Sequence, residues 1–200
     1  MSRWEPNAPG RLEQAAMDLY GERGFDETTV TEIAKRAGLT ERTFYRHFAD
    51  KREVLFGGTS AMKEILVRAV ADAPDGSTPI GVVATSLEAV GALLQERRGR
   101  DFARRRQDII AANAELRERE LIKLASWASA ITGALRDRGV PDPAASLAAE
   151  AGMAVFRIAF ERWVDEHNSR DLPDLIRDSF DKLTALTTQA RWSASASARG

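Results

Sequence analysis

The stretch 28–48 carries the residue types whose spacing points most directly to a function. Thr29 and Glu32 are spaced as a capping box, in which each side chain binds the other residue's backbone amide at the start of a helix. Gly38 stands where a left-handed residue would end that helix, and Thr40 can cap a second one. Two short helices joined by a tight turn that contains glycine predict a helix-turn-helix.

The second of these helices has an apolar inner face and a polar outer face. Phe44 and Phe48 fall four residues apart and point inward together. The outer side chains are rich in hydrogen-bond donors on a helix short enough to enter a major groove, which favours DNA binding. Two short amphipathic helices around a glycine also occur in many other folds. The outer residues are Glu41, Arg42, Thr43, Tyr45, Arg46 and His47.

Three helix N-termini beside this surface favour phosphate binding, because free backbone amides and the helix dipole attract anions. Thr29, Thr40 and Lys51 stand at these N-termini. The whole chain has a net charge of −1, whereas nucleic-acid binders often carry excess base. DNA binding therefore has to rest on this local surface and its geometry.

The composition limits the other kinds of chemistry. The chain has 200 residues, of which 44% are hydrophobic, and it has no cysteine. This excludes disulfides and thiolate metal sites and fits a reducing cytoplasm. His47 and His167 are far apart in the sequence, and we find no phosphate-binding glycine loop and no nucleophile elbow. We therefore expect no catalytic residue, no metal site, no cofactor and no enzyme activity.

The hydrophobic periodicity predicts an all-α chain of about nine helices. We expect one long helix over about 51–73 and helix interruptions at Gly99 and Asn113. Segment 1–10 has no signal-peptide pattern, and no apolar run is long enough for a membrane span, so we expect a cytoplasmic protein. The predicted organisation is a flexible arm over 1–10, a helix-turn-helix domain over 11–56, a helical body over 57–188 and a disordered tail over 189–200.

The head of this chain resembles the tetracycline-repressor (TetR) family over about 45 residues. The family implies a three-helix DNA-binding head, followed by a helical body that dimerises and binds a ligand in a bacterial cytoplasm. The resemblance rests on Gly24-Phe25, Thr29-Val30, Ile33-Ala34, Ala37-Gly38, Thr43-Phe44-Tyr45, His47-Phe48, Lys51 and Leu55-Phe56.

By position in this family, Arg42 and Thr43 would reach bases. Glu41 would accept from a cytosine amino group or would only cap its helix. Arg46 would contact a phosphate or would pair with Asp50 at the surface. The resemblance implies phosphate contacts for Thr29, Tyr45, His47 and Lys51.

The resemblance also implies that the last two helices pair with those of a second copy. Taken alone, the apolar stripe of the last helix and the small residues of the helix before it predict an ordinary core within one chain. A two-fold dimer would place two heads on a palindromic site. The candidate interface residues are Ala148, Gly152, Leu172, Ile176, Phe180 and Leu183.

A ligand pocket among the middle helices is the last implication of the resemblance. Taken alone, its aromatic and aliphatic candidates favour plain core packing over ligand contact. The run 104–106 suits an anionic ligand, although Asp101 and Asp108 are spaced to pair with Arg105. The stretch 104–123 also resembles family members with acyl-CoA-like ligands. The candidate ligand-binding residues are Phe102, Arg105, Ile109, Leu124, Trp127, Phe156 and Phe160.

The sequence thus predicts a dimeric repressor that binds a palindromic operator in double-stranded DNA and is released by a small apolar or acyl-type effector. The main alternative is a constitutive or architectural DNA-binding protein without an effector. An enzyme that uses a cavity of the body is a third hypothesis.

Overall fold

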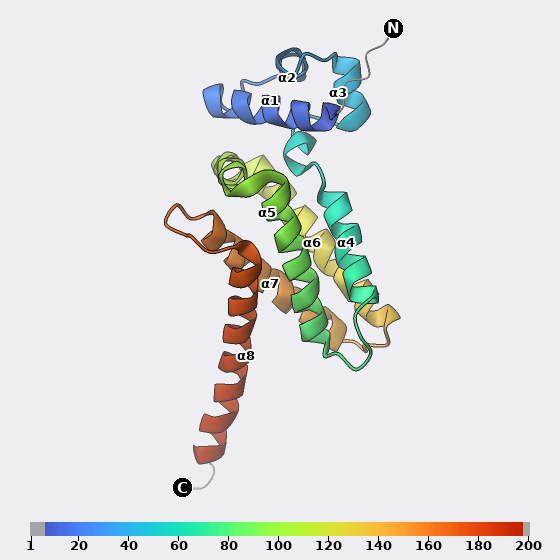
Figure 1. Ribbon diagram of the computed structural model, residues 1–200, viewed down its shortest axis with the longest axis vertical. Coiled ribbons are helices and arrows are strands. Elements are labelled where there is room, and N and C mark those ends of the chain that lie inside the picture. The colour runs from blue at the N-terminus through green and yellow to red at the C-terminus, as the bar shows by residue number, and fades with distance from the viewer. Residues whose placement is uncertain (1–6, 198–200) are drawn as a thin grey trace. The chain divides into compact units, whose positions relative to one another are not determined.

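The computed structural model describes residues 7–197, without the side chains of residue 98 and residues 189–197. Over these residues the chain forms eight α-helices and one 3-10 helix and contains no strand, so the all-α prediction is confirmed. Within the same range, no helix is long and apolar enough to cross a membrane. The elements are α1 (Ala8–Arg23), α2 (Val30–Arg36), α3 (Glu41–His47), η1 (Glu53–Phe56), α4 (Thr59–Ala71), α5 (Pro79–Ala112), α6 (Ala114–Asp137), α7 (Ala144–Val164) and α8 (Leu172–Ser197) (Figure 1).

The chain divides into two compact units. The head unit comprises the chain up to Ala61 together with Phe102–Lys123, and the body unit comprises Met62–Asp101 together with the chain from Leu124 onward. The head therefore contains the end of α5 and the start of α6 in addition to α1, α2, α3 and η1.

Local side-chain caps start the short helices of the head. Thr29 Oγ1 accepts from the Glu32 amide at 3.3 Å, and the Thr29 amide donates to Glu32 Oε2 at 3.0 Å, so the capping box is confirmed. The bonds from Thr29 lower the pKa of the Glu32 carboxyl. Thr40 Oγ1 accepts from the Thr43 amide at 3.2 Å at the start of α3. Gly38, with a φ of 66°, follows the end of α2 as predicted.

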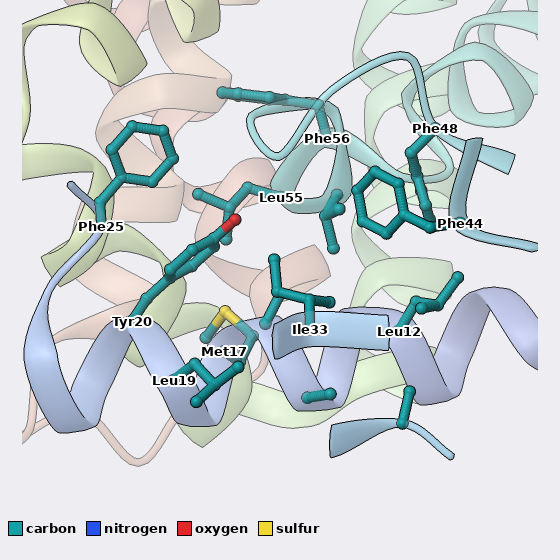
Figure 2. Close-up of a cluster of buried hydrophobic side chains, with 14 of the residues drawn as sticks. Leu12, Met17, Leu19, Tyr20, Phe25, Ile33, Phe44, Phe48, Leu55 and Phe56 are labelled. Atoms are coloured by element: carbon teal, nitrogen blue, oxygen red, sulfur yellow. The ribbon is translucent and has the colours of Figure 1, made fainter. Parts of the chain in front are cut away.

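Side chains from all the helical elements of the head form one hydrophobic core (Figure 2). Phe44 and Phe48 point inward from α3 and pack against each other, with ring centroids 5.7 Å apart. Ile110 and Leu116, on either side of the α5–α6 turn, are buried in the same core. The inner face predicted for α3 is therefore confirmed.

The single helix predicted over 51–73 is wrong, because the chain breaks between η1 and α4. Gly57 lies so close to Glu13 of α1 that a Cβ there would stand 2.3 Å from the carboxylate Oε1. Gly58 follows with a φ of 87°, a conformation that favours glycine. The interruption therefore falls at Gly57 and Gly58, which the periodicity of the apolar residues on both sides does not reveal.

Polar contacts join the α5–α6 corner to η1 inside the head unit. Glu53 accepts from Arg119 Nε at 2.6 Å and from Lys123 Nζ at 3.0 Å. Arg106 Nε donates to the Leu55 carbonyl at 2.7 Å, and its guanidinium lies 5.1 Å from the Phe56 ring centroid. The corner is thus held to the head by several ion pairs and hydrogen bonds.

Close helix packing characterises the body unit. A Cβ at Gly152 of α7 would lie 2.3 Å from Val83 Cγ1 of α5, and one at Gly91 of α5 would lie 2.7 Å from Ile176 Cδ1 of α8. Helices α7 and α8 lie against each other (Figure 1). The predicted interruption at Gly99 is a kink within α5, with a φ of 71°.

The ends of the described chain are more helical than the sequence suggested. Helix α1 already begins at Ala8, because the Asn7 side chain accepts from the Gly10 amide at 3.2 Å and Pro9 suits a first turn. Helix α8 continues through 189–197, most of the segment predicted as a disordered tail. Alanine in that segment favours helix. The rest of both predicted segments, 1–6 and 198–200, lies outside the described residues.

Candidate nucleic-acid interface and effector site

The outer face of α3 is a polar surface that points away from the head core. Tyr45 exposes 57% of its surface although its neighbour Phe44 is fully buried. Within the described residues, the Arg42 side chain makes no hydrogen bond or ion pair. The predicted residues Glu41, Arg42, Tyr45, Arg46 and His47 are all exposed, and Thr43 is half-buried.

Contacts between helices hold this face in position. Thr31 Oγ1 on α2 donates to Glu41 Oε1 on α3 at 2.7 Å, so the Glu41 carboxylate is already oriented by α2. Arg46 Nη2 lies 3.5 Å from His47 Nε2. The ion pair that the sequence suggested between Arg46 and Asp50 is replaced by one between Arg52 and Asp50, at 2.6 Å. The hydrogen bonds from Arg52 lower the pKa of the Asp50 carboxyl.

Several arginines of the head are engaged within it. Arg36 donates to Glu22 through Nη1 and Nη2, at 2.8 and 2.7 Å, and Arg23 binds Glu32 at 2.8 Å. Arg11 donates to the Ala37 carbonyl. Because these cations join α1 to α2, the basic side chains left for an external anion are concentrated on α3 and at Lys35, which is exposed.

Lys51 occupies a different environment from the α3 residues. Its Nζ donates to the carbonyls of Phe25, Asp26 and Thr28 at 2.9, 3.1 and 3.0 Å, and it lies 4.4 Å from the Phe25 ring centroid. An ammonium group has three donors, and all three are used here. The predicted phosphate contact of Lys51 stays a prediction that would require at least one of these bonds to break.

The two remaining helix-start residues lie at exposed positions. Thr29 and Thr40 cap α2 and α3, and the hydroxyl of Thr29 also donates to Glu32 at 2.7 Å. Both hydroxyls already have partners in this structure, so a phosphate would be held there mainly by backbone amides.

The seven predicted ligand residues fall into two groups. Phe102 and Ile109 pack on the core of the head unit, and Arg105 lies 4.0 Å from Asp18 of α1. Its neighbour Arg106 is bound to Leu55 and Glu120, as expected of a structural cation. The body unit holds the other four residues, Leu124, Trp127, Phe156 and Phe160.

A surface hollow of about 390 Å³ lies in the head unit. None of the seven predicted ligand residues lines it. Charged side chains at its wall, among them Glu53, Arg119 and Lys123, are paired with one another. The hollow is therefore a poor match for the apolar effector that the sequence suggested.

The predicted dimer residues lie mainly inside the body unit. Leu172 and Ile176 are fully buried, and Gly152 packs against α5. Ala148 and Phe180 are also buried, whereas Leu183 is half-buried. Most of the stripe that the resemblance assigns to a second copy is thus covered by the same chain. Among the side chains of α7 and α8 that the structure describes, the large exposed apolar ones are Leu147, Ile158 and Leu186.

Comparison with protein families assigns both parts of the chain. A model of the tetR family of bacterial regulatory proteins matches residues 13–56, and a model of the MftR C-terminal domain matches residues 80–188, more than half of the chain. The chain belongs to the TetR family.

Curated relatives within this family are transcriptional regulators. The HTH-type transcriptional regulator TcmR of Streptomyces glaucescens is 33% identical over 100 residues, covering 44% of each chain. The HTH-type transcriptional repressor KstR2 of Mycobacterium tuberculosis is 41% identical over 46 residues, covering 23% of each chain. The matched segments thus span less than half the length of these relatives.

Solved TetR-like structures share the fold at low sequence identity. FadR of Bacillus subtilis, in complex with stearoyl-CoA, is 22% identical, with a TM-score of 0.59 over 86% of this chain and 95% of that one. A complex of SmeT with triclosan is 23% identical, with a TM-score of 0.63 over 90% of each chain. SmeT is described as the repressor of a multidrug efflux pump of Stenotrophomonas maltophilia.

Two residues of the TetR body were not singled out from the sequence. Trp163 of α7 continues the row of rings formed by Trp127, Phe156 and Phe160, and Arg100 of α5 binds the loop that follows α7. Trp163 falls seven residues after Phe156, on the same helix face, and this spacing was the available signal. The sequence offered no comparable signal for Arg100.

Proposed function

We propose that this chain is a ligand-responsive transcriptional repressor that binds a palindromic DNA operator as a homodimer and is released by a small apolar or acyl-type effector. The observation that carries the proposal is the exposed outer face of α3, whose inner side is fixed in the head core by Phe44 and Phe48. Membership of the TetR family supports the same function, and a bacterial cytoplasm is the compartment in which the protein would meet DNA.

Within this proposal, Arg42 is the principal base-reading residue. It lies in the first turn of α3, is exposed, and has no partner among the described residues that would have to be displaced. In the major groove, one guanidinium can donate two hydrogen bonds to a guanine, to its O6 and N7 atoms. Glu41, held by Thr31, would present an acceptor beside it, and Tyr45 and His47 would contact phosphates.

The test is selection of bound duplexes from a random pool, followed by binding measurements with Arg42→Ala. We expect this variant to lose about 1–3 kcal/mol on the selected site and to relax base preference at one position of each half-site. Arg68→Ala removes another exposed arginine, from α4, and serves as the matched control. If the pool yields no enriched site, or if both variants lose affinity equally, α3 is not the reading helix.

The homodimer is proposed through the outer face of α7 and Leu186 of α8. Leu147, Ala151, Ala154 and Ile158 recur at helical spacing on one side of α7, and the leucine and isoleucine are exposed. Leu186 of α8 exposes 68% of its surface. A second copy would cover these apolar side chains and would give the protein the two heads that a palindromic site requires.

Ile158→Glu should split this dimer, because it would bury a carboxylate on both sides of the interface. Light scattering should then report half the wild-type mass, with unchanged helical circular dichroism. Val67→Glu places the same charge at an exposed apolar position of α4 and should leave the dimer intact. A dimeric Ile158→Glu protein would place the interface on another surface.

The effector part of the proposal rests on the apolar, aromatic interior of the body and on the family. SmeT is described in complex with triclosan and FadR in complex with stearoyl-CoA, both of which have large apolar portions. The matched families and relatives are regulators, which favours this function over an enzyme that uses the body as a reaction site.

Calorimetric titration of the effector with and without operator tests this part. The coupling between the two sites is reciprocal, so operator DNA must weaken effector binding by the same factor by which the effector weakens operator binding. Thermal shift against a metabolite library supplies the compounds to be titrated. Equal affinities with and without operator would favour the constitutive DNA-binding protein.

A further inference from the structure

Three buried side-chain N–H groups of the body unit have no hydrogen-bond partner. They are Arg100 Nε, Trp127 Nε1 and Trp163 Nε1, and they are the complete set of such atoms among the described side chains. Indole and guanidinium groups donate hydrogen bonds and have no acceptor atom. Because unpaired buried donors are unfavourable, what this region lacks is acceptor oxygen.

The two indoles are the ends of a row of aromatic rings. The centroid distances are 5.9 Å from Trp127 to Phe156, 6.1 Å from Phe156 to Phe160 and 5.6 Å from Phe160 to Trp163. Trp127 comes from α6 and the other three rings from one side of α7. The row is therefore an extended apolar surface with an unpaired donor on the residue at each end.

Burial along the row indicates where it is reached from solvent. Trp127 exposes 6% of its surface and Trp163 only 1%, and Phe156 is also buried. Phe160, between Phe156 and Trp163, is half-buried. A molecule that enters would therefore displace or pass the Phe160 ring and would then meet an indole N–H.

The third donor adds positive charge near the Trp163 end. Arg100 donates through Nη1 to the Asn168 carbonyl and through Nη2 to the Arg170 carbonyl at 2.9 Å. Asn168 Nδ2 in turn donates to the Trp163 carbonyl at 3.3 Å. Arg100 is thus fixed on the loop that follows Trp163, and an acidic oxygen there would gain from its charge.

A purely structural function of the row would not need the indole nitrogens. Phenylalanine at either tryptophan position would offer a ring face without introducing a buried donor that lacks an acceptor. The combination of a continuous aromatic surface with donors at both ends is what a ligand site for a flat, oxygen-bearing molecule requires.

We propose that the body unit binds a planar apolar molecule that carries a carbonyl or carboxylate oxygen, with its ring system against the aromatic row and its oxygen accepting from an indole Nε1. This inference rests on the proposed function, since it specifies the chemical class of the effector. It adds Trp163 and Arg100 to Trp127, Phe156 and Phe160 and makes no use of Phe102, Arg105 or Ile109.

The experiment titrates the full chain with 2-naphthoate and with naphthalene, which has the same rings and no oxygen. We expect 2-naphthoate to bind at least tenfold more tightly, because only it can pair the buried donors. Because one carboxylate can accept from only one end of the row at a time, Trp127→Phe and Trp163→Phe should each weaken 2-naphthoate about twofold, and the double variant about tenfold. Naphthalene affinity should stay the same in all three variants. Trp4→Phe makes the same chemical change outside the described residues and should alter neither affinity.

Melting curves establish that each variant is folded, and if Trp163→Phe does not fold, Trp127→Phe carries the test alone. Equal binding of the two probes by the wild type, no binding of either, or unchanged 2-naphthoate affinity in the phenylalanine variants would overturn the inference.

A parallel operator-release assay separates this inference from the proposed function. Indole-dependent binding of 2-naphthoate without operator release would uphold the ligand site and contradict its function as an effector site. Release of operator by another compound, unaffected by both phenylalanine variants, would uphold the repressor and overturn the proposed site.

Discussion

The head unit and the body unit differ in how they satisfy their buried polar groups. In the head, Lys51 binds three carbonyls, and the buried Tyr20 hydroxyl donates to the Lys51 carbonyl at 2.6 Å, with burial raising the pKa of Tyr20. In the body, Trp127 and Trp163 leave their N–H groups unpaired. The polar groups of the head named here are thus paired within the chain, whereas the body leaves buried donors without acceptors.

This difference matches what each unit is proposed to do. A recognition helix benefits from being held rigidly in the free protein, because less conformational entropy is then lost when it binds DNA. An effector site works in the opposite way, since a ligand that supplies missing acceptors stabilises the conformation that binds it.

The two units also differ in how far apart in the sequence their stabilising contacts lie. Helices α2 and α3 start with caps that join residues three positions apart. The body depends on close approaches between distant helices, such as Gly152 against Val83. Substitutions should therefore act locally in the head and cooperatively in the body.

The largest effect is expected at Gly152. Valine there should destabilise the protein by about 3 kcal/mol, because its Cβ alone would overlap the buried Val83. Gly133→Val is the matched control on α6, where a Cβ meets nothing within 4 Å, and it should stay within about 0.5 kcal/mol of wild type. Urea unfolding followed by circular dichroism measures both, and similar losses would refute the contrast.

Lys51→Met should cost about 2 kcal/mol, because it removes charged hydrogen bonds to three carbonyls while retaining the apolar stem. The salt dependence of operator binding should stay the same. The phosphate contact predicted from the sequence would instead make the salt dependence of operator binding flatter by about one unit when Lys51 is removed. Measuring unfolding and salt dependence on the same variant decides between the two.

Thr29→Ala should cost about 1 kcal/mol, the usual value of an N-cap, since the change removes the acceptor for the Glu32 amide. Thr29→Ser keeps that oxygen and should recover most of the loss. Denaturant midpoints of the two variants give the comparison, and equal midpoints would mean that the capping box contributes nothing measurable.

The smallest effect is expected from acid titration of the body. Hydrogen bonds from Lys182 and Arg162 lower the pKa of Asp178 to about 2. The stabilisation is therefore present above the ordinary aspartate pKa of about 4 and is lost as the pH falls toward 2. In Asp178→Asn, the denaturant midpoint of unfolding should depend less on pH between about 4 and 2 than it does in the wild type. Asp181→Asn changes an exposed residue of the same helix and should show the wild-type pH dependence.

Local spacing was sufficient for the head because its signals act over three or four residues. The capping box at Thr29, the glycine after α2 and the paired rings of Phe44 and Phe48 all follow from positions close in sequence. The break before α4 falls at Gly57 and Gly58, a local signal that the helical periodicity on both sides outweighed in the prediction.

The sequence by itself determined that the chain is all-helical, where most of its helices begin and end, and which side of α3 faces outward. Only the tertiary structure decided that Leu172 and Ile176 are covered by the same chain, that Lys51 is held by carbonyls, and that two indole N–H groups have no acceptor. Periodicity shows that one face of a helix is apolar, but what covers that face, and which polar atoms find partners there, depends on residues far away in the sequence.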